Sequence, residues 1–386
     1  MIRELKKLWH PIHFVVLLLV VVGTMWNLHN SMYNGAYFLR DEMIAAWEDV
    51  LAQDDPLGYV QKNYNEVDSA LTELQMQYMF AGSEEERQGT KEAIQSLETR
   101  EGSYSNSLPF DLMVLYRIQS RMEHISTLEA QWEKEQDMLA RAVKRKGYEE
   151  DEARRILENS ERYAHLTVPE YANIDPFEDF AEWNTSYAYI VLLPVVWIVA
   201  QAMLVEKKTG MRELICAAAK SPKGVAVRKV GSAWLSAFMI VTGQFLAGLG
   251  IAAYMAGGFG GLASEVQAMY SMGLCYFPLS IGALLCCQLA MQNALAFFAV
   301  GCTMLITAHL QEEWQALPVV VAILIAPNVL HLLFPEAQGL DIASMAGAMQ
   351  PMGANSLAPV LYAIIGIALA AFLCAYACHR FVRIAK

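Results

Sequence analysis

Charged side chains are scarce in this 386-residue chain. Asp, Glu, Lys and Arg make up 18% of it and hydrophobic residues 55%, whereas an average soluble protein has about 25% charged residues. The sequence also lacks a G-x-x-x-x-G-K-[ST] loop, an H-E-x-x-H motif and a G-x-S-x-G elbow. These absences exclude ATP hydrolysis through a Walker site and the metalloprotease and serine-hydrolase chemistries that use those motifs. We therefore expect no catalytic residue, metal or cofactor in this chain.

Cysteine is missing from residues 30–183, and all seven cysteines follow that segment. The segment carries 32 acidic and 15 basic side chains, whereas the rest of the chain carries 8 and 13. Apolar residues recur at spacings of three and four over 64–78 and 108–139, which predicts helices. Ser83 and Glu86 have the spacing of a capping box. We expect an acidic helical domain whose stripes pack on one another; a coiled-coil arm that meets a partner is the alternative.

Long apolar runs surround this acidic segment. A helix needs about 20 apolar residues to cross a bilayer. Candidate runs are 11–28, 187–205, 230–255, 268–290, 293–310, 317–334 and 357–382. The first run follows a cationic "RELKK" but precedes no A-x-A cleavage site, so we interpret it as an uncleaved anchor. The sequence therefore predicts an all-α membrane protein.

The cations outside the acidic segment predict which side each loop occupies. All 13 lie before residue 8, between 207 and 229, or after 379. Cytoplasmic loops carry the excess of Lys and Arg, so both termini and the 207–229 segment should be cytoplasmic and the acidic domain extracellular. The expected order is a tail (1–10), transmembrane helix 1 (11–29), the extracellular domain (30–183), transmembrane helix 2 (184–205), a cytoplasmic segment (206–229) and the remaining helices (230–386).

Residues 230–386 should cross the membrane an even number of times, because this part of the chain starts and ends in the cytoplasm. Five runs follow residue 229, so one should not cross. The run 317–334 contains Pro327 and is flanked by acidic loops, and we expect it to be re-entrant or interfacial, which leaves six crossings. "GGFGG" at 257–261 is expected to be a flexible outer turn.

Amide side chains are the polar groups expected within the bilayer. No membrane-buried Asp, Glu, Lys or Arg is evident, which argues against a carrier that needs an ionisable relay. Gln201, Gln244 and Asn328 are candidates to line a pathway, or they join helices. Three more, Gln288, Gln292 and Asn293, lie near the predicted turn between 268–290 and 293–310, where a structural role is favoured.

The stretch "LVEKKTGMREL", followed by "AAAKSPKGVAVRKVGSAW", resembles the cytoplasmic coupling segment of ABC-2 type transporter permeases. The positions that match the family pattern are Glu206, Lys207, Gly210, Leu214, Pro222 and Lys229. A large outer domain between the first two spans also occurs in that family. The resemblance covers the membrane half and says little about 30–183.

The resemblance implies a permease subunit of a bacterial exporter in the cell membrane. A separate cytoplasmic ABC ATPase would bind the ATP, and a second permease subunit, identical or similar, would complete the pore; no nucleic acid is involved. Docking residues would be Glu206, Lys207, Gly210, Met211, Arg212, Glu213, Leu214 and Ile215. The cations could instead only fix topology and touch anionic lipid headgroups. The alternative function is a membrane-anchored sensor or surface-binding protein that acts through its extracellular helices.

Overall fold

The computed structural model describes residues 11–34, 40–98, 110–146, 150–209, 222–310, 315, 318–323, 326 and 358–383. The chain divides into two compact units. Unit 1 comprises 1–30, 176–254 and 279–386, and unit 2 comprises 31–175 and 255–278. Helices dominate the described residues, and the chain is an all-α membrane protein. Unit 2 thus contains a second piece of chain, 255–278, for which the sequence predicts a turn at 257–261 and the start of a span at 268.

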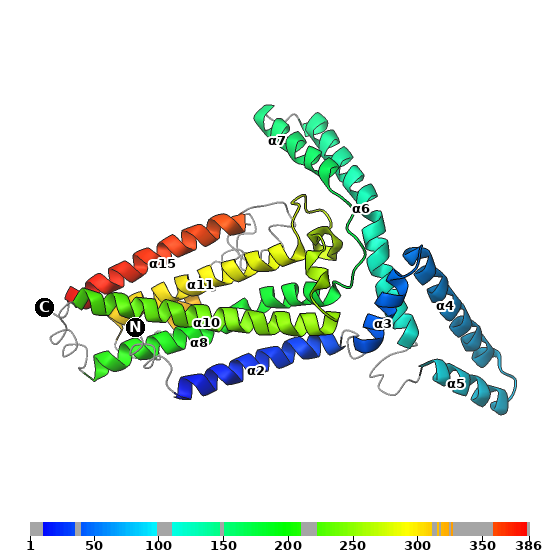
Figure 1. Ribbon diagram of the computed structural model, residues 1–386, viewed down its shortest axis with the longest axis horizontal. Coiled ribbons are helices and arrows are strands. Elements are labelled where there is room, and N and C mark those ends of the chain that lie inside the picture. Colours follow the sequence, from blue (N-terminus) through cyan, green and yellow to red (C-terminus); the bar gives the residue numbers. More distant parts are fainter. Residues whose placement is uncertain are drawn as a thin grey trace. The chain divides into compact units, whose positions relative to one another are not determined.

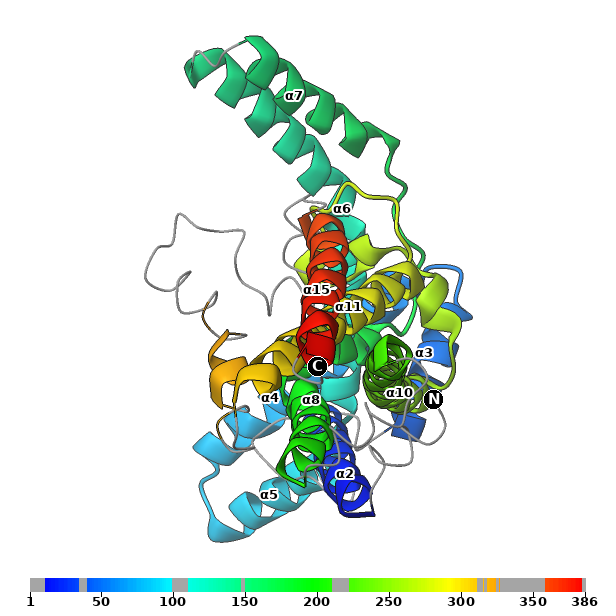
Figure 2. The ribbon, with the colours of Figure 1, turned by 90° about the vertical axis from the view of Figure 1, so that its left-hand side faces the viewer.

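Unit 1 is a bundle of long apolar helices (Figure 1; Figure 2 views it from one end). They are α2 (Pro11–Asn34), α8 (Asp175–Lys208, whose first residue belongs to unit 2), α10 (Pro222–Ala256), α11 (Ile281–His309) and α15 (Ala358–Arg383). By length and composition, four described helices can cross a membrane. They number five if the halves Asp175–Thr185 and Ile190–Gln201 of α8, which meet at 45°, count as one span. Pro194 lies inside the second of these halves.

The directions of these helices divide unit 1 into two ends (Figure 1). α2 and α10 begin at one end, and α8, α11 and α15 finish at that same end. The chain leaves and re-enters unit 1 near residues 30, 176, 254 and 279, and all four points lie at the other end. α11 and α15 run in the same direction, so the end of α11 and the start of α15 lie at opposite ends of the bundle.

The core of unit 1 is aliphatic and closely packed. Val196, Ala299, Val300 and Val320 are fully buried in one cluster. α11 and α15 share the most extensive helix contact among the described elements. Gly301 allows it, since a Cβ there would lie 3.2 Å from the Cα and the carbonyl oxygen of Ala370. Small residues let transmembrane helices approach closely in this way.

The spans expected at 268–290 and 293–310 are wrong. A single helix, α11, covers Ile281–His309, and no turn interrupts it near Gln288 or Asn293. Ser280 caps its first turn by accepting a hydrogen bond from the amide of Ala283 at 3.2 Å. Met269, Met272 and Cys275, which precede Ser280, are buried within unit 2, and residues 268–280 do not form a span. One helix thus replaces two of the five expected spans after residue 229. An even number of crossings therefore no longer requires segment 317–334 to be re-entrant.

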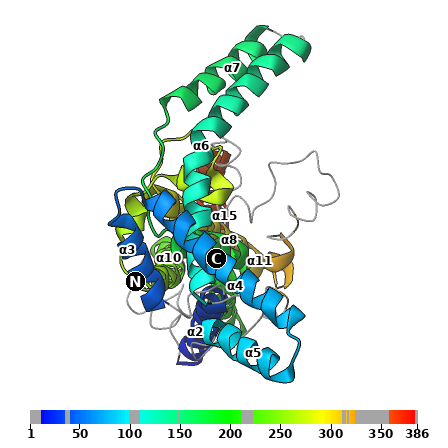
Figure 3. The same cartoon turned by 90° about the vertical axis from the view of Figure 1, so that its right-hand side faces the viewer.

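Unit 2 is built from helices that pair in sequence order (Figure 3). They are α3 (Arg40–Leu51), α4 (Pro56–Phe80), α5 (Glu84–Glu98), α6 (Phe110–Lys146), α7 (Glu150–Glu161) and the 3-10 turn η2 (Arg162–His165). α6 contacts α3 and α4 as well as α7, and its stripe Ile118, Met122, Ile125 and Leu128 is almost fully buried. The predicted long amphipathic helix is confirmed, and its apolar stripe packs inside unit 2.

Local signals at the start of α4 and α5 match the sequence. The Asp55 carboxylate accepts from the amide of Gly58 at 3.1 Å, just before Pro56 begins α4. The capping box before α5 is confirmed: the amide of Glu86 donates to Ser83 Oγ at 3.2 Å, and the amide of Ser83 donates to Glu86 Oε2 at 3.3 Å.

The "GGFGG" turn opens the second piece of unit 2 and is an ordered structure. Gly257 has φ +81° and Gly258 φ +149°, conformations that suit glycine. A Cβ at Gly257 would lie 2.9 Å from Cδ1 of Ile44 in α3. Three short 3-10 turns follow, namely η3 (Gly260–Ala263), η4 (Val266–Ala268) and η5 (Tyr270–Met272).

Hydrogen bonds from α6 and η2 to backbone carbonyls fix this second piece. Trp132 Nε1 donates to the carbonyl of Gly273 and the Tyr163 hydroxyl to that of Leu274, both at 2.7 Å. Within the piece, Gln267 Nε2 donates to the carbonyl of Cys275 at 2.7 Å. Buried backbone without regular structure needs partners of this kind, so residues 255–278 are an integral part of unit 2.

The most buried of these contacts involves a charge. Arg121 is 2% exposed. Its guanidinium donates to Asp175 at 2.5 and 2.7 Å and to the carbonyl of Ala268 at 2.6 Å. It also lies 3.9 Å from the ring centroid of Tyr270. One side chain thereby joins α6, the residue that begins α8 and the inserted 255–278 piece.

Candidate functional site

Positive charge gathers at one end of unit 1. Lys223, Arg228 and Lys229 lie in the first two turns of α10, and the cations of α8 and α15 lie in their last turns. These three helix ends lie at the same end of the bundle, which is also where α2 begins (Figure 1). Arg228 is exposed, and its Nε donates to the carbonyl of Gly224 at 3.0 Å. The end of unit 1 that is joined to unit 2 carries none of these cations.

The predicted ATPase-docking residues begin at this cationic end. Glu206 and Lys207 lie in the last turn of α8. The remaining six, Gly210, Met211, Arg212, Glu213, Leu214 and Ile215, lie outside the described residues. Docking by these residues therefore stays a prediction.

A layer of buried amides and hydroxyls crosses the apolar bundle further from that end. Gln288 of α11 is fully buried. Its Nε2 donates to the carbonyl of Ala181 and its Oε1 accepts from Asn184 Nδ2, both at 3.3 Å. One turn later, Gln292 Nε2 donates to the carbonyl of Asn184 at 3.3 Å. Two consecutive turns of α11 are thus hydrogen-bonded to α8.

The same layer extends to α10 and α2. Asn293 Nδ2 donates to Thr242 Oγ1 at 3.3 Å, which joins α11 to α10. Gln244 Nε2 donates to Thr24 Oγ1 at 3.1 Å, which joins α10 to α2. Thr24 itself donates to the carbonyl of Val20 in the preceding turn at 2.8 Å. Four helices of unit 1 are therefore connected by uncharged polar groups.

Two acceptors in this layer remain open among the described residues. Gln244 Oε1 and Asn293 Oδ1 are buried and have no hydrogen-bond partner there. A buried polar atom without a partner costs about 1–3 kcal/mol. These two oxygens can accept hydrogen bonds from a polar substrate or from water. Because amide side chains do not ionise, they cannot relay protons.

The structure describes two of the three predicted pathway residues, Gln201 and Gln244, and it does not bring these two together. Gln244 belongs to the polar layer. Gln201 is half-buried on α8, seven residues before that helix ends at Lys208. α10 begins at this same, cationic end of the bundle, and Gln244 lies 22 residues after its first residue. With a rise of about 1.5 Å per residue, the two differ in height along the bundle by about 20 Å. Asn328 lies outside the described residues.

Comparison with known proteins gives no match. No family model, curated protein or solved structure matches this chain. The transporter resemblance therefore rests on the sequence stretch and the membrane topology alone. Family, partner and cargo are proposals.

Sequence reasoning missed part of the polar layer. The sequence predicts no role for Asn184, the first residue of an expected span, or for Thr24 and Thr242, which lie among apolar neighbours. These residues can be recognised only by their distance from amide side chains on other helices. That distance depends on how the helices are aligned in three dimensions. Gln288, Gln292 and Asn293 were noticed, and their predicted structural role agrees with the hydrogen bonds.

Proposed function

We propose that this chain is the membrane permease subunit of an ABC-2 type transporter that exports its substrate. The observation that supports this most is the clustering of the cationic helix ends of α8, α10 and α15 at one end of unit 1, opposite the points where the chain continues into the acidic unit 2. By the positive-inside rule, the cationic end is cytoplasmic. A separate ATPase can reach residues 206–229 only from that side.

The proposed topology has six crossings of the bacterial cell membrane and both termini in the cytoplasm. α11 and α15 run in the same direction, so the chain must return across the bundle between them. Residues 318–323 are helical, and Val320 is fully buried in the apolar core of unit 1. We therefore propose a fifth crossing that includes residues 318–323, in place of the re-entrant element expected from the sequence. Unit 2 is then extracellular.

In this proposal, the ATPase acts on residues 206–215 between α8 and α10. ATP-driven closure of two ATPase subunits moves the cytoplasmic ends of these helices in two permease subunits. The polar layer joins α8 to α11 through three hydrogen bonds of 3.3 Å, and it joins α10 to α11 and to α2 through one hydrogen bond each, of 3.3 and 3.1 Å. Hydrogen bonds between transmembrane helices average about 0.6 kcal/mol, so they can exchange partners as the bundle changes between inward-open and outward-open forms.

The sidedness is tested by cysteine labelling in intact cells. Lys208→Cys and Glu84→Cys are each compared with the wild-type chain, which reports the labelling of native thiols. With a membrane-impermeant maleimide, Glu84→Cys should be labelled in intact cells, because Glu84 is exposed on α5 of unit 2. Lys208→Cys should be labelled only after the cells are opened. Labelling of Lys208→Cys from outside would overturn the proposal.

The ATPase partner is tested by purifying the tagged full-length chain from its native membrane and measuring vanadate-sensitive ATP hydrolysis. Replacing residues 212–215 by alanine should remove the ATPase activity from the purified sample. Arg228→Ala is the control, because it removes a cation at the same end but outside the docking residues. If no ATPase activity co-purifies with the wild-type chain, the result would instead favour a sensor or surface-binding protein.

A further inference from the structure

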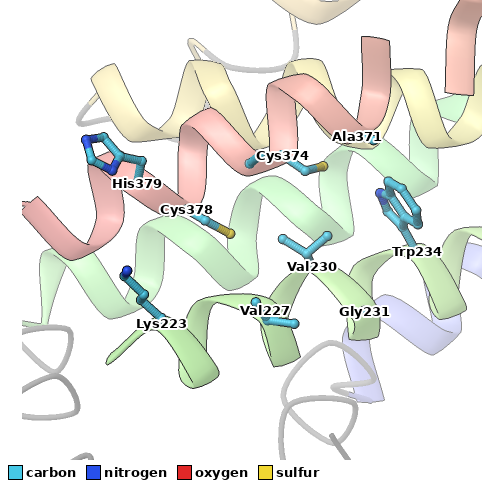
Figure 4. A pocket seen from close by; sticks show the side chains of 10 residues that line it. Lys223, Val227, Val230, Gly231, Trp234, Ala371, Cys374, Cys378 and His379 are labelled. Carbon is cyan, nitrogen blue, oxygen red and sulfur yellow. The ribbon is translucent and has the colours of Figure 1, made fainter. Parts of the chain in front are cut away.

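An apolar groove lies between the first half of α10 and the second half of α15 (Figure 4). Its volume is 580 Å³, within the range of about 300–1,000 Å³ that is typical of small-molecule sites. Both helices belong to unit 1. The residues that line it are Lys223, Val227, Val230, Gly231, Trp234, Ala371, Cys374, Ala375, Cys378 and His379.

The groove exists because one of its walls has little side-chain volume. On α15, Cys374, Ala375 and Cys378 lie three, four and seven residues after Ala371, so the four residues share one face. Across from them, Gly231 has no side chain at all. Facing helices with larger side chains at these positions would close the gap.

Polarity changes along the groove. Lys223 and His379 extend from the two helices at one end, and Trp234 and Ala371 lie at the other (Figure 4). Both Lys223 and His379 are exposed. None of the described residues that line the groove is acidic, so none of them neutralises Lys223. The site therefore combines an apolar channel with a cationic mouth at the cationic end of unit 1.

We propose that this groove binds one anionic phospholipid of the surrounding membrane. The phosphate group accepts hydrogen bonds from the Lys223 ammonium and from a ring N–H of His379, and one acyl chain lies along Val227, Val230 and Trp234. Basic pockets between transmembrane helices at the cytoplasmic surface recognise anionic headgroups in this way. The inference requires only that unit 1 spans a membrane, and it does not depend on an ATPase partner.

The headgroup must supply most of the selectivity. An acyl chain leaves one apolar environment, the bilayer, for another, so the hydrophobic effect contributes little to the choice of lipid. The Lys223 ammonium, in contrast, distinguishes a lipid with net negative charge from a zwitterionic one. Phosphatidylglycerol should therefore be preferred over phosphatidylcholine with the same chains, while the small residues of α15 provide room for the chain.

The test uses the purified full-length chain in detergent with equal amounts of phosphatidylglycerol and phosphatidylcholine, and native mass spectrometry counts each bound lipid. The wild-type chain should retain phosphatidylglycerol with at least a ten-fold preference. Lys223→Met removes the charge but keeps the apolar stem, and it should abolish this preference. Arg228→Met is the matched control: it removes an exposed cation of the same helix that does not line the groove, and it should leave the preference within about two-fold.

Three results would overturn the inference. Equal retention of the two lipids by the wild-type chain would remove the headgroup preference, and equal losses in Lys223→Met and Arg228→Met would show general surface charge. Displacement of the lipid by an equal concentration of glycerol phosphate would show a site for free phosphate that needs no acyl chain.

A second variant, Ala375→Phe, fills the groove from an exposed position and should reduce phosphatidylglycerol binding at an unchanged melting temperature. A lower melting temperature without loss of lipid would indicate that another part of the chain occupies the groove.

Discussion

Replacing Arg121 with methionine tests how the two pieces of unit 2 are joined. The guanidinium is almost fully buried, is paired with Asp175 and donates to the carbonyl of Ala268. Methionine has a similar stem, so the change mainly removes the charge and its donors. Breaking one partner out of a buried ion pair costs about 3–5 kcal/mol, because the other charge is left uncompensated. Arg117, 4.0 Å from Asp175, offsets part of this loss.

Hydrogen exchange of the full-length chain, followed by mass spectrometry, measures the effect locally. When exchange proceeds through rapid reversible opening, each 1.4 kcal/mol accelerates it about ten-fold. Arg121→Met should therefore accelerate exchange of the amides of residues 266–275 by roughly 150- to 4,000-fold. Amides in unit 1 should exchange as in the wild type, because the ion pair lies within unit 2.

Arg141→Met is the matched control on the same helix. Arg141 pairs with Asp137 at 2.8 Å, but both side chains are 68% exposed. An exposed i,i+4 pair contributes about 0.3–0.5 kcal/mol, so the control should change exchange by no more than about two-fold. Equal effects of the two substitutions would refute the view that Arg121 holds the 255–278 piece in place. A further variant, Arg121→Met with Asp175→Leu, should be milder than Arg121→Met alone, since no buried charge is left unpaired.

Three other predictions concern the helix contacts of unit 1 and the core of unit 2. Gln288→Leu leaves the Ala181 carbonyl and Asn184 without their partner, and it should lower stability in detergent by about 1 kcal/mol; an unchanged melting temperature would contradict the polar layer. Gly301→Val should cost about 1–3 kcal/mol through overpacking against α15, whereas Gly243→Val should be tolerated because no atom lies within 4 Å of its Cβ. Burial raises the pKa of the Cys275 thiol from 9.0 to about 11. At pH 8, alkylation of Cys275, measured on its peptide, should therefore be about 100-fold slower in the folded than in the unfolded chain, and equal rates would show that the thiol is accessible.

Much of the helical structure was predictable because its signals are local. The stripe over 108–139 and the Ser83–Glu86 box depend on residues three or four positions apart. Both features correspond to α6 and to the start of α5. For such elements the sequence contains all the information needed, since the interacting groups are neighbours on one helix.

The failures arose where the deciding partner is distant in sequence. Residues 268–280 are apolar enough to suggest a span, yet Met269, Met272 and Cys275 are buried inside unit 2. Composition alone cannot distinguish a side chain that faces lipid from one that faces protein. Conversely, Gln288 and Asn293 suggested a polar turn, yet they lie inside α11, where α8 and α10 supply their partners. An amide can be accommodated inside a bundle once its hydrogen bonds are satisfied, and the sequence does not reveal those partners.

The corrected boundary changes what unit 2 can do in the proposed transporter. Residues 255–278 directly continue α10 and α11, and α6 holds them through Arg121, Trp132 and their carbonyl partners. Unit 2 is therefore linked covalently to α2, α8, α10 and α11, four helices of unit 1. A movement that separates α10 from α11 at this end must either bend the chain near residues 254 and 279 or break contacts worth several kcal/mol inside unit 2. Because the second route is costly, the outer ends of α10 and α11 should stay at a fixed spacing, and the opening of a pathway should occur between other helices.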